Sequence, residues 1–201
     1  MNKFKAIGFD YGGVLNDSKS TLPGISKILN VPQEELRAIY FKNNHLANVD
    51  GLSYEELWKK IAVDLGQPEK ATEISEHMHQ QWSYETNKDM LALVKELKGL
   101  GFKIGLLSNN TKEIGDRLRA EGVDKYFDCF IISAETGFQK PDPRIFSLLL
   151  EQLDVKADEL IFTDDSTNSL RTAEEVGYHP ILFTGYVSFR QELIKLGVLP
   201  N

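Results

Sequence analysis

Four short segments of the chain carry polar side chains of the kinds that transfer phosphoryl groups. Asp10 ends the first apolar run, Ser108 directly follows the second, and Lys140 precedes a helix-like stretch. Asp164 and Asp165 together follow a later apolar run. These are a carboxylate nucleophile, a hydroxyl, an ammonium group and a metal-binding pair of acids. Such a set suits chemistry that passes through an aspartyl-phosphate.

The apolar runs beside these residues have strand character and alternate with helical patterns. The strand-like runs are Phe4–Phe9, Phe102–Leu107, Cys129–Ile132, Leu160–Phe162 and Ile181–Phe183, and amphipathic stretches lie near Lys112–Glu121, Pro143–Leu153 and Leu170–Val176. Gly122 and Gly177 stand where helix C-termini are expected. The alternation predicts an α/β fold with a doubly wound, Rossmann-like parallel sheet and right-handed crossovers.

The expected sheet would bring the polar residues together. In an open parallel sheet, ligands bind beyond the carboxyl ends of the strands. Asp10, Ser108 and the Asp164–Asp165 pair all occupy such ends. We therefore expect residues that are far apart in the sequence to meet in one crevice.

The stretch between the first two strands breaks the alternation and shows only helical patterns. Ser53-Tyr54-Glu55-Glu56 is a capping box, and Leu57, Ile61 and Leu65 then share one helical face that Gly66 ends. Other helices are expected near Pro23–Leu29, from Pro32, near Pro68–Gln81 and, at the far end of the chain, over Val187–Leu196. The simplest interpretation is a helical domain of residues 16–87 inserted into a core domain of residues 1–15 and 88–201, with hinges near Leu15–Ser20 and Ser83–Lys88.

Composition indicates an ordinary globular protein and excludes several functional classes. The 201 residues include 23 basic and 30 acidic ones, giving a net charge of -7 without any basic run, so we expect no nucleic-acid binding. No apolar stretch is long enough for a membrane span, and the start of the chain has no signal-peptide pattern. The lone Cys129 lies in an apolar run, where a buried structural thiol is the expected role. We expect a cytoplasmic protein of undetermined oligomeric state that acts on a small molecule.

The four polar segments together resemble the motifs of the haloacid dehalogenase (HAD) superfamily, in the branch with a small helical cap after the first strand. The matching motifs are Phe-Asp-Tyr-Gly-Gly-Val-Leu around Asp10, Leu-Leu-Ser-Asn at Ser108, Gln-Lys-Pro-Asp-Pro around Lys140, and Phe-Thr-Asp-Asp-Ser at the acid pair. The passage from Asn168 to Gly177 also matches. Within the superfamily, the chain resembles bacterial sugar-phosphate phosphatases of the glucose-1-phosphate type.

The resemblance implies a metal site around the nucleophile. Asp10 would attack phosphorus, and Mg²⁺ would separate the two negatively charged reactants. The implied ligands are the carboxylates of Asp10 and Asp165 and the backbone carbonyl of Gly12, with Asp164 contributing directly or through water. The implied substrate is a small phosphorylated metabolite, such as a sugar phosphate.

The resemblance also implies which groups hold the phosphoryl group. Ser108 would donate a hydrogen bond to a phosphoryl oxygen, and the backbone N–H of Asn109 would add another. Lys140 would neutralise Asp10 and the equatorial charge that develops during transfer. Each motif could instead have a purely structural role. Ser108 and Asn109 could be turn and cap residues, Lys140 a solvated surface lysine, and the acid pair helix-capping residues.

One position departs from the pattern of most phosphatases in this superfamily. They carry a second aspartate two residues after the nucleophile, as general acid and base, where this chain has Gly12. Three readings follow: another group such as Asp17 or a cap residue replaces it, the leaving group needs little protonation, or the protein turns over slowly or only binds.

Two alternative functions remain open at this point. A 2-haloacid dehalogenase would use the same aspartate on carbon and would not need the acid pair. A catalytically weak protein with this fold would bind or regulate instead. For either enzyme the helical domain should set substrate choice, with Tyr40, Phe41, Asn44, His45 and Trp82 as candidate contacts.

Overall fold

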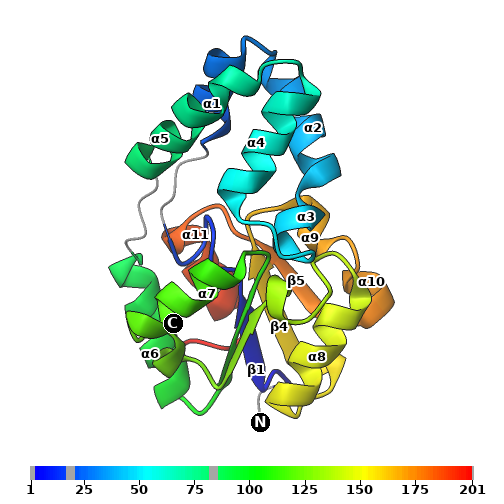
Figure 1. The fold of residues 1–201 in the computed structure, drawn as a ribbon. Coiled ribbons are helices and arrows are strands. Elements are labelled where there is room, and N and C mark those ends of the chain that lie inside the picture. Colours follow the sequence, from blue (N-terminus) through cyan, green and yellow to red (C-terminus); the bar gives the residue numbers. More distant parts are fainter. Residues whose placement is uncertain (1–2, 17–20, 82–85, 201) are drawn as a thin grey trace.

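The computed structural model describes residues 3–16, 21–81 and 86–200. They form a five-stranded sheet with helices on both faces and a helical segment beyond the carboxyl ends of the strands (Figure 1). The predicted α/β architecture with a parallel sheet is therefore confirmed.

The sheet places the first strand at its centre. The strands are β1 (Ala6–Phe9), β2 (Lys103–Ser108), β3 (Cys129–Ile132), β4 (Leu160–Asp164) and β5 (His179–Leu182). Their order is β3-β2-β1-β4-β5, and all neighbouring pairs are parallel. The register pairs Phe9 with Leu106 on one side and with Thr163 on the other. Asp10, one residue beyond Phe9, therefore lies between the ends of β2 and β4.

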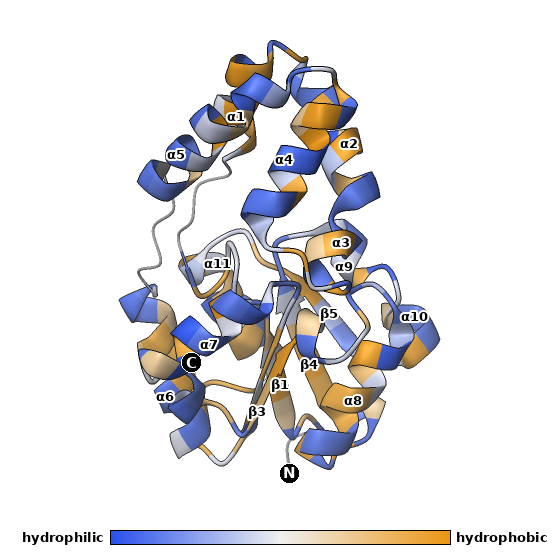
Figure 2. Cartoon of the chain, in the orientation of Figure 1, coloured by the Kyte–Doolittle hydropathy of each residue, from blue (hydrophilic) through white to orange (hydrophobic). Residues whose placement is uncertain are grey.

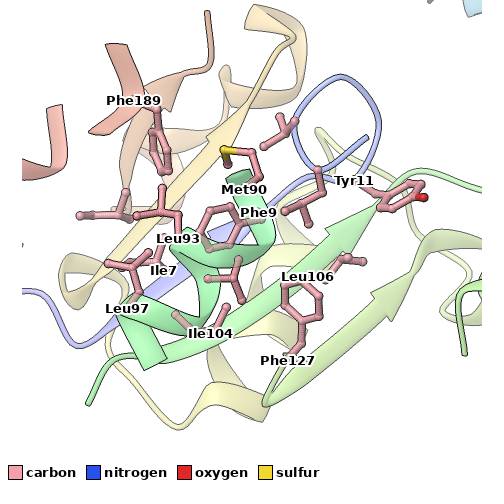
Figure 3. Packing of buried hydrophobic residues seen from close by; sticks show 14 of the residues in the cluster. Ile7, Phe9, Tyr11, Met90, Leu93, Leu97, Ile104, Leu106, Phe127 and Phe189 are labelled. Atoms are coloured by element: carbon pink, nitrogen blue, oxygen red, sulfur yellow. The ribbon is translucent and has the colours of Figure 1, made fainter. Parts of the chain in front are cut away.

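Two apolar layers cover the two faces of the sheet. One contains side chains of α6 (Lys88–Gly99), α7 (Lys112–Ala120) and α11 (Tyr186–Lys195), and the other contains side chains of α8 (Pro143–Leu153) and α10 (Ala173–Val176). Figure 3 shows the first layer, in which Phe9 of β1 meets Leu93 of α6 and Phe189 of α11. Figure 2 shows β1, β3 and β4 in the colours of apolar residues, whereas the helices carry both polar and apolar ones. Burial on both faces explains why these strands read as unbroken apolar runs.

The helices between β1 and β2 have an apolar core of their own. They are α1 (Leu22–Leu29), α2 (Gln33–Asn43), α3 (His45–Asn48), α4 (Tyr54–Asp64), the short 3₁₀ turn η1 (Pro68–Lys70) and α5 (Ala71–Gln81). We call residues 21–81 the helical insert. Ile25, Leu36, Leu57, Ile61 and Ile74 are fully buried in it. Ser53 and Glu56 form the predicted capping box at the start of α4.

The structure differs from the predicted elements in a few places. Helix α6 has no counterpart among the predictions, although Asn87 caps it by accepting from the N–H groups of Asp89 and Met90. The single helix expected over Leu170–Val176 is two short ones, α9 (Thr167–Leu170) and α10, and β1 begins at Ala6 rather than Phe4. Short 3₁₀ turns at Asp124–Tyr126, Ser133–Glu135 and Ala157–Glu159 complete the order. Most of the two expected hinges lies outside the described residues.

Among the described helices, none combines the length and the apolar character needed to cross a membrane.

Candidate active site

The sheet brings the predicted polar residues to one edge. Asp10 follows β1, Ser108 is the last residue of β2, and Asp164 is the last residue of β4. Lys140 lies in the loop before α8, and its Nζ is 2.8 Å from Asp10 Oδ1 and 2.5 Å from Asp164 Oδ2. The expected convergence of these segments is therefore present in the structure.

Three carboxylates surround the end of β1. Oxygens of Asp10, Asp164 and Asp165 all lie within 4.8 Å of one another. Burial, opposed by Lys140 and reinforced by Asp164, raises the pKa of Asp10 to about 7. Burial and the neighbouring Asp164 also raise the pKa of Asp165. The cluster thus has an excess of negative charge, because among the described residues Lys140 is the only cation in ion-pair contact with it and Arg37 acts on Asp165 only from a greater distance.

This donor set fits a hard divalent cation. Three ionised carboxylates beside one ammonium leave an excess of two negative charges, and Mg²⁺ prefers oxygen ligands of this kind. A bound cation would stabilise the ionised carboxylates, because metal ions lower the pKa of the groups that coordinate them.

Lys140 is held as a buried ammonium. Its side chain is 1% exposed and its Nζ lies 5.3 Å from the centre of the Phe162 ring. Burial alone lowers the pKa of Lys140, but the adjacent Asp10 and Asp164 outweigh it and raise the pKa above its usual value. The lysine is therefore charged at neutral pH, and the reading of Lys140 as a solvated surface lysine is wrong.

Asn109 fixes the backbone of Lys140. Its Oδ1 accepts from the Lys140 N–H at 2.7 Å, and its Nδ2 donates to the Lys140 carbonyl at 2.8 Å. These two bonds join the end of β2 to the loop before α8. We expected Asn109 to act through its backbone N–H, and the side-chain role was not foreseen.

The remaining phosphate-binding candidate, Ser108, is 1% exposed at the end of β2. The parallel register sets it beside Ile132 on one side and near Asp10 on the other. Ser108 therefore lies at the same edge of the sheet as the carboxylates. Asp164 also accepts a hydrogen bond from the Ser166 N–H at 2.8 Å, which stabilises the turn after β4. The same side chain forms the ion pair with Lys140.

The loop after Asp10 makes close contact with the acid pair through Gly13. Gly13 has φ +72°, and a Cβ at this position would collide with the Asp165 carboxylate. Gly12 is different, because a Cβ there would have no other atom within 4 Å. A side chain at position 12, where most phosphatases of the superfamily carry the second aspartate, would therefore have free space around its Cβ.

A cavity of about 680 Å³ opens from the carboxylate cluster toward the helical insert. Lys140 and Asp165 border it on the core side, and Phe41 and Asn44 border it on the insert side. A second hollow of about 630 Å³ shares Gln139, Pro141 and Arg171 with this cavity but contains none of the predicted site residues. The first cavity is therefore the place for the rest of a substrate.

The helical insert contacts the core at the residue before Lys140. Asn48 Nδ2 donates to Gln139 Oε1 at 3.1 Å, and the Tyr54 hydroxyl donates to Asn48 Oδ1 at 3.2 Å. Gln139 Nε2 lies 3.5 Å from Asn44 Oδ1. Helix α3 of the insert also contacts the 3₁₀ turn Ser133–Glu135 of the core.

The predicted contacts from the helical insert divide into three groups. Phe41 and Asn44 line the cavity. Tyr40 instead stacks on Trp58, with ring centres 5.5 Å apart, and His45 lies 3.8 Å from Asp50 on the surface. Trp82, like Asp17, lies outside the described residues.

Cys129 has the structural role expected of it. Its thiol is buried and lies 3.1 Å from Gln152 Oε1. Burial raises the pKa of Cys129 to about 12, so a nucleophilic thiolate is disfavoured at neutral pH.

Comparison with known sequences matches most of this chain to one family. The sequence model of haloacid dehalogenase-like hydrolases matches residues 7–183. A sesquiterpene phosphatase of Aspergillus oryzae is 29% identical over 201 residues, which is 96% of each protein. Mouse bifunctional epoxide hydrolase 2 is 32% identical over 115 residues, 55% of this chain. The match spans only 21% of that longer enzyme.

Solved structures of the same fold include a HAD-family enzyme and a dehalogenase. A HAD-family enzyme of Bacteroides thetaiotaomicron, in complex with magnesium and inorganic phosphate, has a TM-score of 0.64 at 22% identity, covering 89% of this chain and 93% of that one. A dehalogenase has a TM-score of 0.65 at 18% identity, covering 90% of this chain and 84% of that one. At these identities the likeness shows the fold alone.

Proposed function

Because the chain belongs to the haloacid dehalogenase-like hydrolase family, we propose that it is a Mg²⁺-dependent phosphatase that hydrolyses a small phosphorylated metabolite through an aspartyl-phosphate. The observation that carries the proposal is the cluster of Asp10, Asp164 and Asp165 around the buried Lys140. The phosphatase of Aspergillus oryzae that aligns along the whole chain supports the same class of reaction.

The first step joins the substrate to Asp10. A carboxylate oxygen of Asp10 forms a bond to phosphorus while the bond from phosphorus to the substrate oxygen breaks. Lys140 stabilises the charge on the equatorial oxygens, and Ser108 and the Asn109 N–H donate hydrogen bonds to them. Water then attacks the aspartyl-phosphate and releases inorganic phosphate and free Asp10.

The metal would be held by Asp10, the carbonyl of Gly12, Asp165 and Asp164. A bound Mg²⁺ supplies positive charge between the nucleophile and the phosphoryl oxygens. Asp164 also accepts from Lys140, so this carboxylate helps to keep the ammonium aligned with Asp10. A structural relative solved in complex with magnesium and inorganic phosphate supports the choice of Mg²⁺ as the metal.

Position 12 is a glycine and so carries no side chain that could give a proton to the leaving group. We infer that the substrate has a leaving group that needs little protonation, or that a residue such as Asp17 takes the role. An anomeric oxygen, as in a sugar 1-phosphate, is one such group. The helical insert acts as a cap that closes over the cavity and excludes water. A cytoplasmic location remains a prediction.

Dehalogenation is the second candidate, since a dehalogenase shares the fold. Attack on carbon needs no metal, whereas this chain brings three carboxylates within 4.8 Å. A protein that only binds would not need its lysine held against the nucleophile. We therefore place phosphate transfer first.

The decisive assay is phosphate release from a panel of phosphorylated metabolites and a nitrophenyl ester, with Mg²⁺ and with EDTA. We expect Mg²⁺-dependent release from at least one member. If the whole panel stays intact, halide release from 2-haloacids and binding of inorganic phosphate are the next measurements, and the phosphatase proposal is withdrawn.

The Asp10→Asn variant tests the nucleophile directly. It removes the attacking charge but keeps the side-chain shape, so phosphate release should fall at least about 10³-fold. Asp64→Asn is the matched control, because Asp64 lies on the surface of α4 and its one ion pair among the described residues is with Lys60. Wild-type activity in the Asp10→Asn protein would show that Asp10 is not the nucleophile.

A further inference from the structure

Two arginines distinguish the cavity from the rest of the protein. The sequence contains six arginines, all of them within the described residues. Four pair with carboxylates: Arg117 with Glu121, Arg119 with Glu135, Arg144 with Asp142 and Arg190 with Glu96. Arg37 and Arg171 have no carboxylate partner among the described residues, and both line the cavity beside Lys140.

Arg37 reaches the cavity from the helical insert. Its guanidinium lies 5.1 Å from the centre of the Phe41 ring, one turn further along α2. Phe41 is itself 47% exposed and lines the same cavity, so its ring supports the guanidinium without neutralising it. The position of Arg37 is therefore defined, while its charge remains available.

Arg171 reaches the cavity from the core. It follows α9, in the segment that leads away from the acid pair. The neighbouring lining residues Thr167, Asn168 and Ser169 add hydroxyl and amide groups. The two arginines thus come from the two parts of the molecule that the cavity separates.

The charge of this cavity is opposite to that of the protein as a whole. The net charge of the chain is -7, yet the lining contains three cations, Arg37, Lys140 and Arg171, and one carboxylate, Asp165. Lys140 is already paired with Asp10 and Asp164. The cations left for a ligand are the two arginines, whose planar donor sets suit carboxylate and phosphate groups.

We propose that the substrate carries a second anionic group, a carboxylate or a second phosphoryl group, which Arg37 and Arg171 bind while Asp10 attacks the first phosphoryl group. The inference rests on the proposed phosphatase function and narrows its substrate class to doubly anionic metabolites. Because one arginine belongs to the helical insert and the other to the core, such a substrate also connects the two parts across the cavity.

Matched substrate pairs test the proposal. 3-Phosphoglycerate and glycerol 3-phosphate differ by a carboxylate in place of a hydroxymethyl group, and fructose 1,6-bisphosphate and fructose 6-phosphate differ by a second phosphate. We expect kcat/KM to favour the more anionic member of at least one pair by about tenfold or more, mainly through KM. The preferred pair identifies the second group as a carboxylate or a phosphate.

The arginine variants assign that preference to the cavity. In the double variant Arg37→Gln with Arg171→Gln, the ratio of kcat/KM within the preferred pair should fall about tenfold, toward one. Arg190→Gln is the control, since Arg190 pairs with Glu96 between α11 and α6 and should leave the ratio unchanged. Equal kcat/KM within both pairs, or a preference that survives the double variant, overturns the proposal.

A binding measurement separates this inference from the phosphatase proposal. Titration calorimetry of 3-phosphoglycerate and glycerol 3-phosphate, and of the fructose pair, on the Asp10→Asn protein needs no turnover. Tighter binding of a doubly anionic member, lost in the arginine double variant, supports the anion site even if no substrate is hydrolysed. Equal binding within each pair contradicts it even if hydrolysis is observed.

Discussion

Lys140 carries its charge in a place from which water is almost excluded. Its ammonium is held between Asp10 and Asp164, and its backbone is fixed on both sides by Asn109. Removing one partner of such a buried pair leaves the other charge uncompensated, which is strongly destabilising. Substitutions at Lys140 or Asp10 therefore mix effects on folding with effects on catalysis, and Gly12, which has no part in this pairing, gives a cleaner test.

Gly12→Asp should place a proton donor near Asp10. A Cβ at position 12 meets no other atom within 4 Å, so the added side chain has room. A positioned general acid and base contributes about 10²–10⁴ in rate. We expect phosphate release from alkyl phosphates to rise by up to about 10²-fold, with a smaller gain for the nitrophenyl ester, whose leaving group needs less protonation.

Gly12→Asn is the matched control, because it adds similar volume without an acid. If both variants change the two substrates equally, the gain is not due to proton transfer. If Gly12→Asp leaves alkyl phosphates unchanged, another group already protonates the leaving group and Gly12 is not the limiting position.

The loops at the ends of β2 and before α8 act as one unit through Asn109. Asn109→Ala removes both hydrogen bonds to the Lys140 backbone. We expect kcat to fall about 10- to 100-fold, because a small displacement of the ammonium weakens its action on the phosphoryl group. Thermal unfolding and steady-state kinetics on the same protein measure both effects.

Thr136 provides a comparison for this variant. Its hydroxyl bonds only to backbone groups of the loop that precedes Lys140, Ser133 and Phe138, and not to Lys140 itself. Thr136→Val should therefore affect stability more than kcat. A kcat for Asn109→Ala equal to that of the wild-type protein would mean that Lys140 is positioned by its carboxylate partners alone.

Much of the element order follows from local sequence pattern. Apolar runs locate all five strands to within about two residues, and the Ser53–Glu56 capping box and Pro143 mark the starts of α4 and α8. Helix α6 was not predicted, although its buried Met90, Leu93, Val94 and Leu97 are spaced as on one helical face.

The sequence predicts those site residues whose type and position indicate chemistry. It does not predict hydrogen bonds between neutral polar side chains and residues far away in the sequence. Asp10, Ser108, Lys140 and the acid pair follow strand ends or match known motifs. The Asn109–Lys140 bonds join residues 31 positions apart, and the Asn48–Gln139 bond joins residues 91 apart. No local pattern encodes such pairs, because they depend on how the loops and the helical insert pack.

At the scale of the whole molecule, the carboxylate cluster links stability to pH. The Asp10 carboxyl has a pKa of about 7 in the folded protein, against an ordinary value of 3.8. At a pH between these two pKa values, the Asp10 carboxyl is protonated in the folded protein and ionised in the unfolded chain. The contribution of this group to the free energy of unfolding therefore decreases as pH rises from about 4 to about 7.

Mg²⁺ should reverse that loss. The cation binds ionised carboxylates, so its stabilising effect is small at about pH 5.5 and larger at about pH 8. At a hundredfold excess over Kd the free energy of unfolding rises by about 2.7 kcal/mol, which corresponds to about 5–10 °C in Tm. Thermal unfolding with Mg²⁺ and with EDTA at both pH values measures the difference.

Asp165→Asn should remove most of this Mg²⁺-dependent increase in Tm, whereas Asp64→Asn on the surface of α4 should retain it. An increase of the same size at both pH values, or one unaffected by Asp165→Asn, would indicate that the cation binds elsewhere.

The central position of β1 also has a consequence for how the chain assembles. This strand pairs with β2 near residue 103 and with β4 near residue 160, and neither partner is close to it in the sequence. Pairings of such long range are formed slowly, since the intervening chain must first be ordered. During synthesis Asp10, at the end of β1, is made before β4 and acquires its acid partners only after β4 has been made. A growing chain therefore carries Asp10 throughout the synthesis of the segment between β1 and β4 before the carboxylate cluster can form.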